Sequence, residues 1–313
     1  MKAHATLDVV SLGEAMVEFN QTQAGQPEYL QGFGGDTSNA VIAAARAGAR
    51  TAYLTRVGAD AFGHMLLDLW AREGVSTEAI DTDALAPTGL YFVTHGDAGH
   101  SFSYRRAGSA ASLMTPAWLD GEPRQLLEAA QVLHLSGISL AISPQACDTA
   151  FAAMHAARAS GTQVAFDSNL RLKLWPLDRA QACTRHAVGL CDLFLPSLDD
   201  MVALTGLTQP DAIVDWGHAH GAATVVLKLG GDGVLVSHAG RREQLPAHPV
   251  KVVDATGAGD CFCGNLLARV AAGDDVFAAA CYANAAAALA VQGWGAVGPL
   301  PTADAVRRLM RHG

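Results

Sequence analysis

The segment DATGAGD, which ends at Asp260, combines residue types that suit chemistry on an anion. Gly257 and Gly259 let the backbone turn tightly because they carry no Cβ. The NH groups of residues 257–259 then lie at the start of a helix expected over about 260–272, where unpaired amide donors form an anion site. Asp260 is either a cap of this helix or, beside a bound phosphate, a general base for a hydroxyl that attacks phosphorus.

Two other glycine-rich turns follow segments that favour strands. Residues 32–39 (GFGGDTSN) open a helix expected to end near Ala47, with Gly48 as its cap, and residues 230–233 (GGDG) follow the apolar run 225–229. None of the three turns is a G-x-x-x-x-G-K-[ST] phosphate loop or a G-x-G-x-x-G fingerprint in the first strand-to-helix turn. The sequence therefore disfavours a nicotinamide-dependent oxidoreductase. The remaining features are an anion site, a neighbouring carboxylate and a second glycine turn that could bind a nucleotide.

Two polar side chains project from the first turn of the helix that begins after Gly35. Asp36 suits this position because a carboxylate is stabilised at the positive end of the helix dipole. Asn39 is a poor residue for a helix interior, which favours a contact with a ligand. This helix start is therefore a second candidate binding segment.

An antiparallel hairpin is expected between residues 89–95 and 101–106, because two alternating strands are joined by GDAG. An insertion of this kind in a β/α chain often covers a site as a lid. Its tyrosines and arginines suit recognition of a polar anionic ligand, although a solvated strand edge also explains the arginines. These side chains are Tyr91, Tyr104, Arg105 and Arg106.

The rest of the chain alternates strands with helices, which predicts a parallel sheet with helices on its faces. Strands are expected at 7–12, 51–57, 132–135, 164–166, 193–195 and 225–229, with a short β-like run at Val250, Val252 and Val253. Open α/β sheets bind ligands at the carboxyl ends of their strands. The polar segment 167–175 (DSNLRLKLW) follows such a strand and is therefore a third candidate.

The composition of the 313-residue chain is that of a compact globular protein, with 50% hydrophobic and 16% charged residues. A net charge of −9 argues against a general nucleic-acid-binding protein. The six cysteines form no C-x-x-C pair, so we expect reduced thiols in a cytoplasmic protein. No apolar stretch of signal-peptide length begins the sequence, and the small-residue run 278–291 favours a buried helix over a membrane span.

Two of these segments resemble long signatures of the ribokinase (phosphofructokinase-B) family of sugar kinases. GGDTSNA at residues 34–40 is similar to the N-terminal signature, and DATGAGD at 254–260 is similar to the C-terminal one. The two stand in the family's order and span nearly the whole chain. The resemblance implies one ribokinase-like domain over residues 1–313, with a three-layer α/β/α fold and a mainly parallel central sheet. It also implies a small β-sheet lid formed by about 14–34 and 86–108.

Within the family, three segments look like those of 2-keto-3-deoxygluconate kinases: GGDT at 34–37, YRRAGSAAS at 104–112, and the segment 167–175. A sugar acid carries a carboxylate, and Arg106 and Arg171 could supply the cationic donors that it requires. A fructokinase or another neutral-sugar kinase is an alternative for which both arginines are surplus. A non-catalytic sugar-binding regulator is the alternative from a different class.

The resemblance also assigns roles to residues. It implies that Asp260 is the general base, and that the NH groups of Gly257, Ala258 and Gly259 form an anion hole for the γ-phosphoryl group of ATP, aided by Mg²⁺. The residues expected at the sugar are Gly34, Gly35, Asp36, Asn39, Tyr91, Tyr104, Arg106 and Arg171. Those expected at the nucleotide are Asn169, Lys228, Gly230, Gly231, Gly233 and Asn284.

The metal positions depart in part from the family's pattern. Many members carry an Asn-x-x-Glu motif that organises the water shell of the metal, and the matching segment here, 197–200, reads SLDD. Asp200 could act on Mg²⁺ through water, or Asp199 and Asp200 could be a charge pair at a helix start. Asp254 matches a position that helps bind a monovalent cation, such as K⁺, in some relatives.

The expected partners are a small-molecule sugar acid and ATP, with no nucleic acid and no membrane. The exposed strand edges of the lid favour pairing with a second copy of the chain. We therefore expect a homo-oligomer, a dimer formed through the lid.

Overall fold

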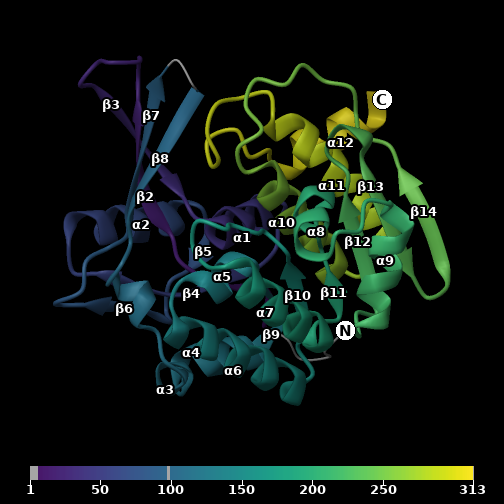
Figure 1. The fold of residues 1–313 in the computed structure, drawn as a ribbon, viewed down its shortest axis with the longest axis horizontal. Coiled ribbons are helices and arrows are strands. Elements are labelled where there is room, and N and C mark those ends of the chain that lie inside the picture. The colour runs from purple at the N-terminus through teal and green to yellow at the C-terminus, as the bar shows by residue number, and fades with distance from the viewer. Residues whose placement is uncertain (1–5, 97–98, 313) are drawn as a thin grey trace.

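A ten-stranded sheet forms the middle layer of the protein, of which the computed structural model describes residues 6–96 and 99–312 (Figure 1). In spatial order its strands are β14 (Arg241–Leu245), β13 (Val234–His238), β12 (Thr224–Lys228), β11 (Leu193–Phe194), β10 (Gln163–Asp167), β9 (Ala130–Ser136), β1 (Leu7–Leu12), β4 (Thr51–Gly58) and β5 (Val75–Ser76), with β6 (Ile80–Asp83) paired to β4. All pairs are parallel except β12–β13 and β13–β14. The prediction of a mainly parallel sheet is confirmed.

Helices cover both faces of this sheet, because side chains alternate in direction along each strand. On β1, Val9 lies in the apolar cluster of one face and Val10 in the cluster of the other. The first face is covered by α1 (Asp36–Arg46), α2 (Ala61–Arg72), α10 (Ala258–Ala271), α11 (Val276–Ala290) and α12 (Ala303–His312). The second is covered by α3 (Pro116–Leu119), α4 (Glu122–Ala129), α5 (Gly137–Ala141), α6 (Pro144–Ser160), α7 (Leu177–Leu190), α8 (Leu198–Thr205) and α9 (Pro210–Ala219). This is the three-layer α/β/α arrangement predicted from the sequence.

Helices α1 and α10 pack closely because Gly264, on the face of α10 that contacts α1, has no side chain. A Cβ at Gly264 would lie 2.8 Å from the Cβ of Ala43 and would overlap the carbonyl oxygen of Ala40. The neighbouring helix α11 is rich in alanine and almost entirely buried, which confirms the prediction of a buried helix there. The close approach brings the first turns of α1 and α10 together at the carboxyl edge of the sheet.

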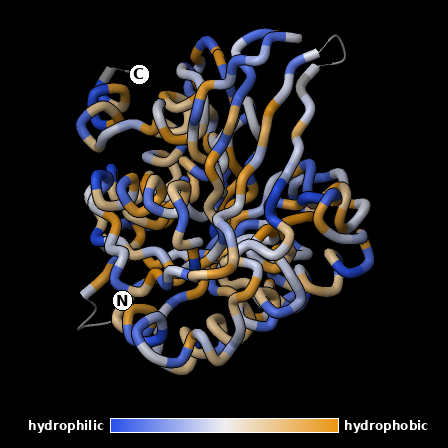
Figure 2. Tube along the Cα trace, turned by 90° about the vertical axis from the view of Figure 1, so that its left-hand side faces the viewer, coloured by the Kyte–Doolittle hydropathy of each residue, from blue (hydrophilic) through white to orange (hydrophobic). Residues whose placement is uncertain are grey.

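A separate four-stranded sheet projects from one side of the body (Figure 1). Its strands lie in the order β3 (Tyr29–Gly34), β2 (Met16–Gln21), β7 (Leu90–Gly96) and β8 (Gly99–Arg105). The pair β2–β7 is parallel and the other two pairs are antiparallel. Figure 2, turned by 90°, shows β7 and β8 rising clear of the helical layers. We call these four strands the small sheet.

The strand expected at residues 250–253 does not form. The chain from 246 to 257 has no regular structure, and Val252 and Val253 are exposed. The NH groups of Val253 and Asp254 donate to the carbonyl oxygen of Val291 at the end of α11, at 2.7 and 3.2 Å. The segment is therefore tied to a helix end, and its valines have no neighbouring strand to pair with.

No helix in residues 6–96 or 99–312 combines the length and the apolar character needed to cross a membrane.

Candidate active site

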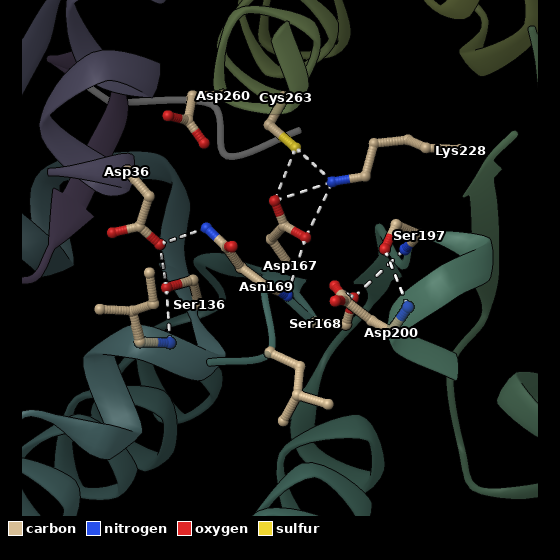
Figure 3. A network of polar contacts seen from close by, with 12 residues as sticks. Asp36, Ser136, Asp167, Ser168, Asn169, Ser197, Asp200, Lys228, Asp260 and Cys263 are labelled. Carbon is tan, nitrogen blue, oxygen red and sulfur yellow. Dashed lines mark hydrogen bonds and ion pairs between the residues drawn. The ribbon is translucent and has the colours of Figure 1, made fainter. Parts of the chain in front are cut away.

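Polar and charged side chains from five elements meet at the carboxyl edge of the large sheet (Figure 3). Asp167 ends β10, Lys228 ends β12 and Ser136 ends β9, while Asp36 and Asp260 lie in the first turns of α1 and α10. Parallel strands all end at the same edge, so segments far apart in the sequence converge there. This edge is the candidate active site.

Asp260 is held by a residue of the other glycine-rich segment. The side-chain amide of Asn39 donates to Oδ2 of Asp260 at 2.8 Å, across 221 residues of sequence. Asn39 is almost fully buried, and its own Oδ1 has no partner within the described part of the chain. The two helix starts predicted from glycine patterns therefore form one site.

The pKa of Asp260 is raised to about 7. Burial is the largest cause, because it disfavours the charged form, and the carboxylates of Asp36 and Asp167 add to it. The amide of Asn39 and the ammonium of Lys228 act in the opposite direction. A carboxyl group with this pKa changes protonation near neutral pH, which suits a general base.

The turn before Asp260 presents free amide donors. Gly257 has a φ of 73° and a Cβ there would press against Ala296, so glycine is needed at this position. The NH of Ala258 donates to the carbonyl of Ala255 at 3.2 Å, whereas those of Gly257 and Gly259 have no partner in the described part of the structure. Two such donors at the start of a 14-residue helix are suited to binding an anion.

A buried ion pair lies beside this turn. Lys228 Nζ lies 2.8 Å from both carboxylate oxygens of Asp167. Burial lowers the pKa of Lys228, but the neighbouring acidic groups, with the Asp167 carboxylate foremost, together outweigh burial and raise it, so the ammonium stays charged. The thiol of Cys263 donates to Asp167 Oδ2 at 3.4 Å. The sequence placed Lys228 at the nucleotide but gave no signal for this pairing.

Asp36 lies in a second polar cluster. Its Oδ2 accepts hydrogen bonds from the Ser136 hydroxyl and, at 2.8 Å, from the Asn169 amide. Its Oδ1 is buried without a partner in the residues described. Asn169, which was expected at the nucleotide, therefore contacts an expected sugar residue. Its φ of 23° shows that a non-glycine residue is held in an uncommon conformation here.

The small sheet contributes Tyr91, which lies directly over Gly34. Its hydroxyl donates to Glu18 on β2, and its ring lies near that of Tyr104, with 5.8 Å between centroids. Burial raises the pKa of Tyr91, and the Glu18 carboxylate raises it further. Because the Tyr91 proton is engaged by Glu18, the tyrosine oxygen faces other groups as an acceptor. Sequence reasoning missed Glu18; its only signal was its place in an alternating strand.

Substituting Gly34 with Ala should raise the KM for the expected sugar substrate by roughly 5- to 150-fold, because overpacking typically costs about 1–3 kcal/mol. The new Cβ would lie 2.7 Å from Cε1 of Tyr91 and still closer to its hydroxyl, so Tyr91 must move. Steady-state kinetics with the sugar varied measure the effect. Gly96→Ala, on the same sheet and with open space around the new Cβ, is the matched control. An unchanged KM in Gly34→Ala would show that Tyr91 does not contact the sugar.

Arg106 is already paired with a carboxylate. Its Nη2 forms an ion pair with Glu14, which is 1% exposed, and Ser109 Oγ donates to the other Glu14 oxygen at 2.5 Å. Arg106 Nε is buried without a partner among the described residues. Sequence reasoning missed Glu14, whose only signal was its place just after the first strand. Arg171, in contrast, is exposed and donates to the carbonyl oxygen of Leu170 at 2.7 Å.

The remaining nucleotide candidates lie near the end of β12 and on α11. Gly230 and Gly231 form a short 3₁₀ turn with Asp232. Gly233 has a φ of 89°, and a Cβ at this position would overlap the carbonyl oxygen of Leu245. The side-chain amide of Asn284 donates to the carbonyl of Pro246 at 3.2 Å. Asn284 therefore anchors the irregular segment 246–257.

The two metal candidates have different surroundings. Asp200 accepts from the Ser168 hydroxyl at 2.7 Å, and Ser197 caps the helix that carries it. Asp254 accepts from the NH and hydroxyl of Thr256 and from the NH of Gly295. The described residues contain no group of three or more His, Cys, Asp or Glu side chains that could hold an ion by themselves. Asp200 fits Mg²⁺ held through water, since this ion keeps much of its water shell.

Comparisons with known proteins identify the family of the chain. The model of the pfkB family of carbohydrate kinases matches residues 6–303. The chain is 34% identical to 2-dehydro-3-deoxygluconokinase of Thermoproteus tenax, over 99% of this chain and 96% of that protein. It is 32% identical to fructokinase-2 of Solanum habrochaites, over 97% and 96%. The fructokinase of Xylella fastidiosa with bound ATP superposes with a TM-score of 0.88, at 25% identity, over 97% of this chain and 98% of that one.

The match over nearly the whole length accounts for both signatures and for the ribokinase-like layers. The chain is a phosphotransferase that uses a hydroxyl group as acceptor, and it belongs to the pfkB family of carbohydrate kinases.

Proposed function

We propose that this protein transfers the γ-phosphoryl group of ATP to the primary 6-hydroxyl of 2-keto-3-deoxygluconate. The observation that carries the proposal is Asp260, a carboxyl group with a pKa of about 7 placed directly after two free NH groups at a helix start. The similarity to 2-dehydro-3-deoxygluconokinase and the buried Nε of Arg106, which has no partner among the described residues, support the sugar acid as substrate.

In this mechanism the sugar lies between the two helix starts and the small sheet. Asp36 Oδ1 and Asn39 Oδ1, both buried without partners in the described residues, would accept from sugar hydroxyls beside Gly34 and Gly35. Tyr91, Tyr104, Arg106 and Arg171 would contact the sugar acid, while the small sheet closes over it as a lid. Asp260 would take the proton of the attacking hydroxyl, and the NH groups of Gly257 and Gly259 would stabilise charge on the phosphoryl group.

The nucleotide would lie along Lys228, Gly230, Gly231 and Gly233, between Asn169 and Asn284. Mg²⁺, when bound, would offset the charge of the phosphates. Asp200 would hold it through water, and Asp254 would take part in a K⁺ site.

A neutral-sugar kinase, such as a fructokinase, is the second candidate, and one observation favours it. Glu14 already balances the charge of Arg106, and Glu18 adds a further carboxylate to the small sheet. A carboxylate-bearing substrate would have to compete with Glu14 for the guanidinium. A non-catalytic sugar-binding regulator is the remaining alternative from another class, and the base and free NH groups of the site weigh against it.

A coupled ADP-release assay with Mg-ATP, comparing 2-keto-3-deoxygluconate, fructose and ribose, tests the proposal. We expect the highest kcat/KM with the keto-deoxy acid. Preference for fructose would select the second candidate. Absence of turnover with every sugar would favour the regulator.

The rate should depend on pH through Asp260. A base acts only when deprotonated, so kcat/KM should fall about tenfold per pH unit below the pKa of about 7 and level off above it. A pH profile of kcat/KM for the sugar measures this limb. A flat profile down to pH 5 would show that the base is another group or has an ordinary carboxyl pKa.

We also propose that two copies of the chain pair through the small sheet. Its edge strands β3 and β8 carry the exposed apolar side chains of Tyr29, Leu30 and Phe102. An edge strand with unpaired backbone groups favours pairing with another strand. Sedimentation equilibrium should give a dimer, and Leu30→Lys should shift it toward monomer; a monomeric wild-type protein would contradict the proposal.

A further inference from the structure

The ammonium of Lys228 lies next to the anion-binding turn, with room left beside it. Nζ lies 2.8 Å from both oxygens of Asp167 and 3.6 Å from Sγ of Cys263 (Figure 3). A Cβ added to Gly259 would lie 3.6 Å from the same Nζ, so the glycine keeps the space between turn and ammonium open. Two of the three N–H donors are engaged by Asp167, and among the described residues the third is left with the thiol of Cys263, which is a weak acceptor.

We propose that Lys228 is a catalytic residue that contacts the transferring phosphoryl group, and that Asp167 is a positioning residue that holds Lys228 beside residues 257–259. This inference rests on the proposed kinase function and deepens it. It adds the positive charge of Lys228 to the anion hole, and it assigns Asp167 the role of holding Lys228 in place. Phosphoryl transfer spreads negative charge over the oxygens of the moving group. A cation fixed in advance in a partly dry site stabilises that charge without reorganisation.

The ion pair fixes Lys228 in two ways. Its side chain is only 13% exposed, and the two oxygens of Asp167 hold Nζ from one side. The Cys263 thiol donates to Asp167 Oδ2, which helps to orient the carboxylate. An incoming phosphoryl oxygen would add a further anionic partner to Nζ without requiring Lys228 to change its rotamer.

Lys228 and Asp167 also act on Asp260, in opposite directions. The Asp167 carboxylate raises the pKa of Asp260, and the Lys228 ammonium lowers it. The other groups that face these three residues are Asp36 on α1, Asp200 on α8, His134 on β9, Tyr91 of the small sheet, and Cys261 and Cys263 on α10. Burial lowers the pKa of His134 to about 4 and raises that of Cys261 to about 12, and burial also raises the pKa of Cys263 and Tyr91. These four groups therefore stay neutral near pH 7, and the two carboxylates remain in every variant below.

Three variants test the inference through pH profiles of kcat and of kcat/KM for the sugar. Lys228→Met should lower kcat about 10²–10³-fold, the typical effect of losing one donor to a developing oxyanion. It should also move the acid limb to higher pH, because a cation that favours the charged form of Asp260 is gone. Asp167→Asn should lower kcat less and move the limb to lower pH, because a neighbouring anion is gone. The double variant should keep the kcat of Lys228→Met with its limb near the wild-type position.

Opposite limb shifts separate this role from a merely structural one. Limbs that stay in place, or that move in the same direction in both single variants, would overturn the inference, as would a near-normal kcat in Lys228→Met. If Lys228→Met does not fold because Asp167 is left unpaired, the double variant decides by its kcat, since it removes both charges. Asp211→Asn, an exposed carboxylate paired with Arg242, is the control for net charge and should leave the limb unchanged. Absence of wild-type turnover with any sugar would contradict the kinase proposal itself, which is a different result.

Discussion

Replacing Asp260 with Asn should lower kcat about 10²–10⁴-fold, the range expected when a general base is removed. The change keeps the size of the side chain and the contact with Asn39, whose amide can still donate to the Asn carbonyl oxygen. It replaces a carboxylate, which can take a proton beside the NH groups of the turn, with an amide, which cannot. The sugar Kd, measured by calorimetry, should change only a few-fold, because the amide retains hydrogen-bonding capacity.

Asp260→Glu is the informative companion to this variant. Glutamate keeps a carboxylate but moves it by one methylene, and effective general-base catalysis depends on hydrogen-bond reach to the hydroxyl. We expect a kcat between those of the wild type and Asp260→Asn, with a pH-dependent limb still present. The limb should be lost in Asp260→Asn. A kcat close to wild type in Asp260→Asn would show that Asp260 is a helix cap and that the attacking hydroxyl loses its proton elsewhere.

The parts of the structure that were predicted from the sequence depend on local signals. Gly34, Gly35, Gly257 and Gly259 mark helix starts because glycine permits the tight backbone turns that precede these helices. The alternation of strand and helix patterns along the sequence predicted a parallel sheet. A parallel sheet brings the carboxyl ends of its strands to one edge. These two facts agree with the shared site that the family resemblance implied for Asp36 and Asp260.

The parts that were missed depend on partners distant in the sequence. Glu14 meets Arg106, Glu18 meets Tyr91, and Asp167 meets Lys228, each across 61 residues or more. A single sequence shows that a lysine or an arginine is present, but not whether another charge already balances it. The strand predicted at residues 250–253 is wrong for the same reason. A strand needs a neighbouring strand, and in this fold the segment lies against the end of a helix instead.

The pairing of Arg106 with Glu14 affects how the choice between a sugar acid and a neutral sugar must be tested. Arg106 lies at the junction between the small sheet and the body, where Glu14 and Ser109 surround it. A guanidinium has five N–H donors, so one edge can remain on Glu14 while another binds the substrate carboxylate. The pair therefore does not exclude a sugar acid, but it reduces the net charge that such a substrate meets.

Arg106→Ala should reduce kcat/KM for 2-keto-3-deoxygluconate by roughly 30-fold to several thousandfold. Truncating one partner of a buried, hydrogen-bonded charge pair costs about 2–5 kcal/mol. The kcat/KM for fructose should fall much less, because fructose has no carboxylate to lose its partner. Both sugars are measured with the same enzyme preparation, so any general damage from leaving Glu14 unpaired affects both values and cancels in their ratio.

Two further variants make this ratio decisive. Arg105→Ala removes the neighbouring arginine, which is exposed, and should leave the ratio unchanged. The double variant Glu14→Gln/Arg106→Met removes both charges of the buried pair and should restore folding stability if Arg106→Ala is destabilised. It should still discriminate against the acid, because the cation is absent. If both sugars respond equally in Arg106→Ala and in the double variant, the arginine serves only the junction between the sheets, and the neutral-sugar kinase becomes the better description of the site.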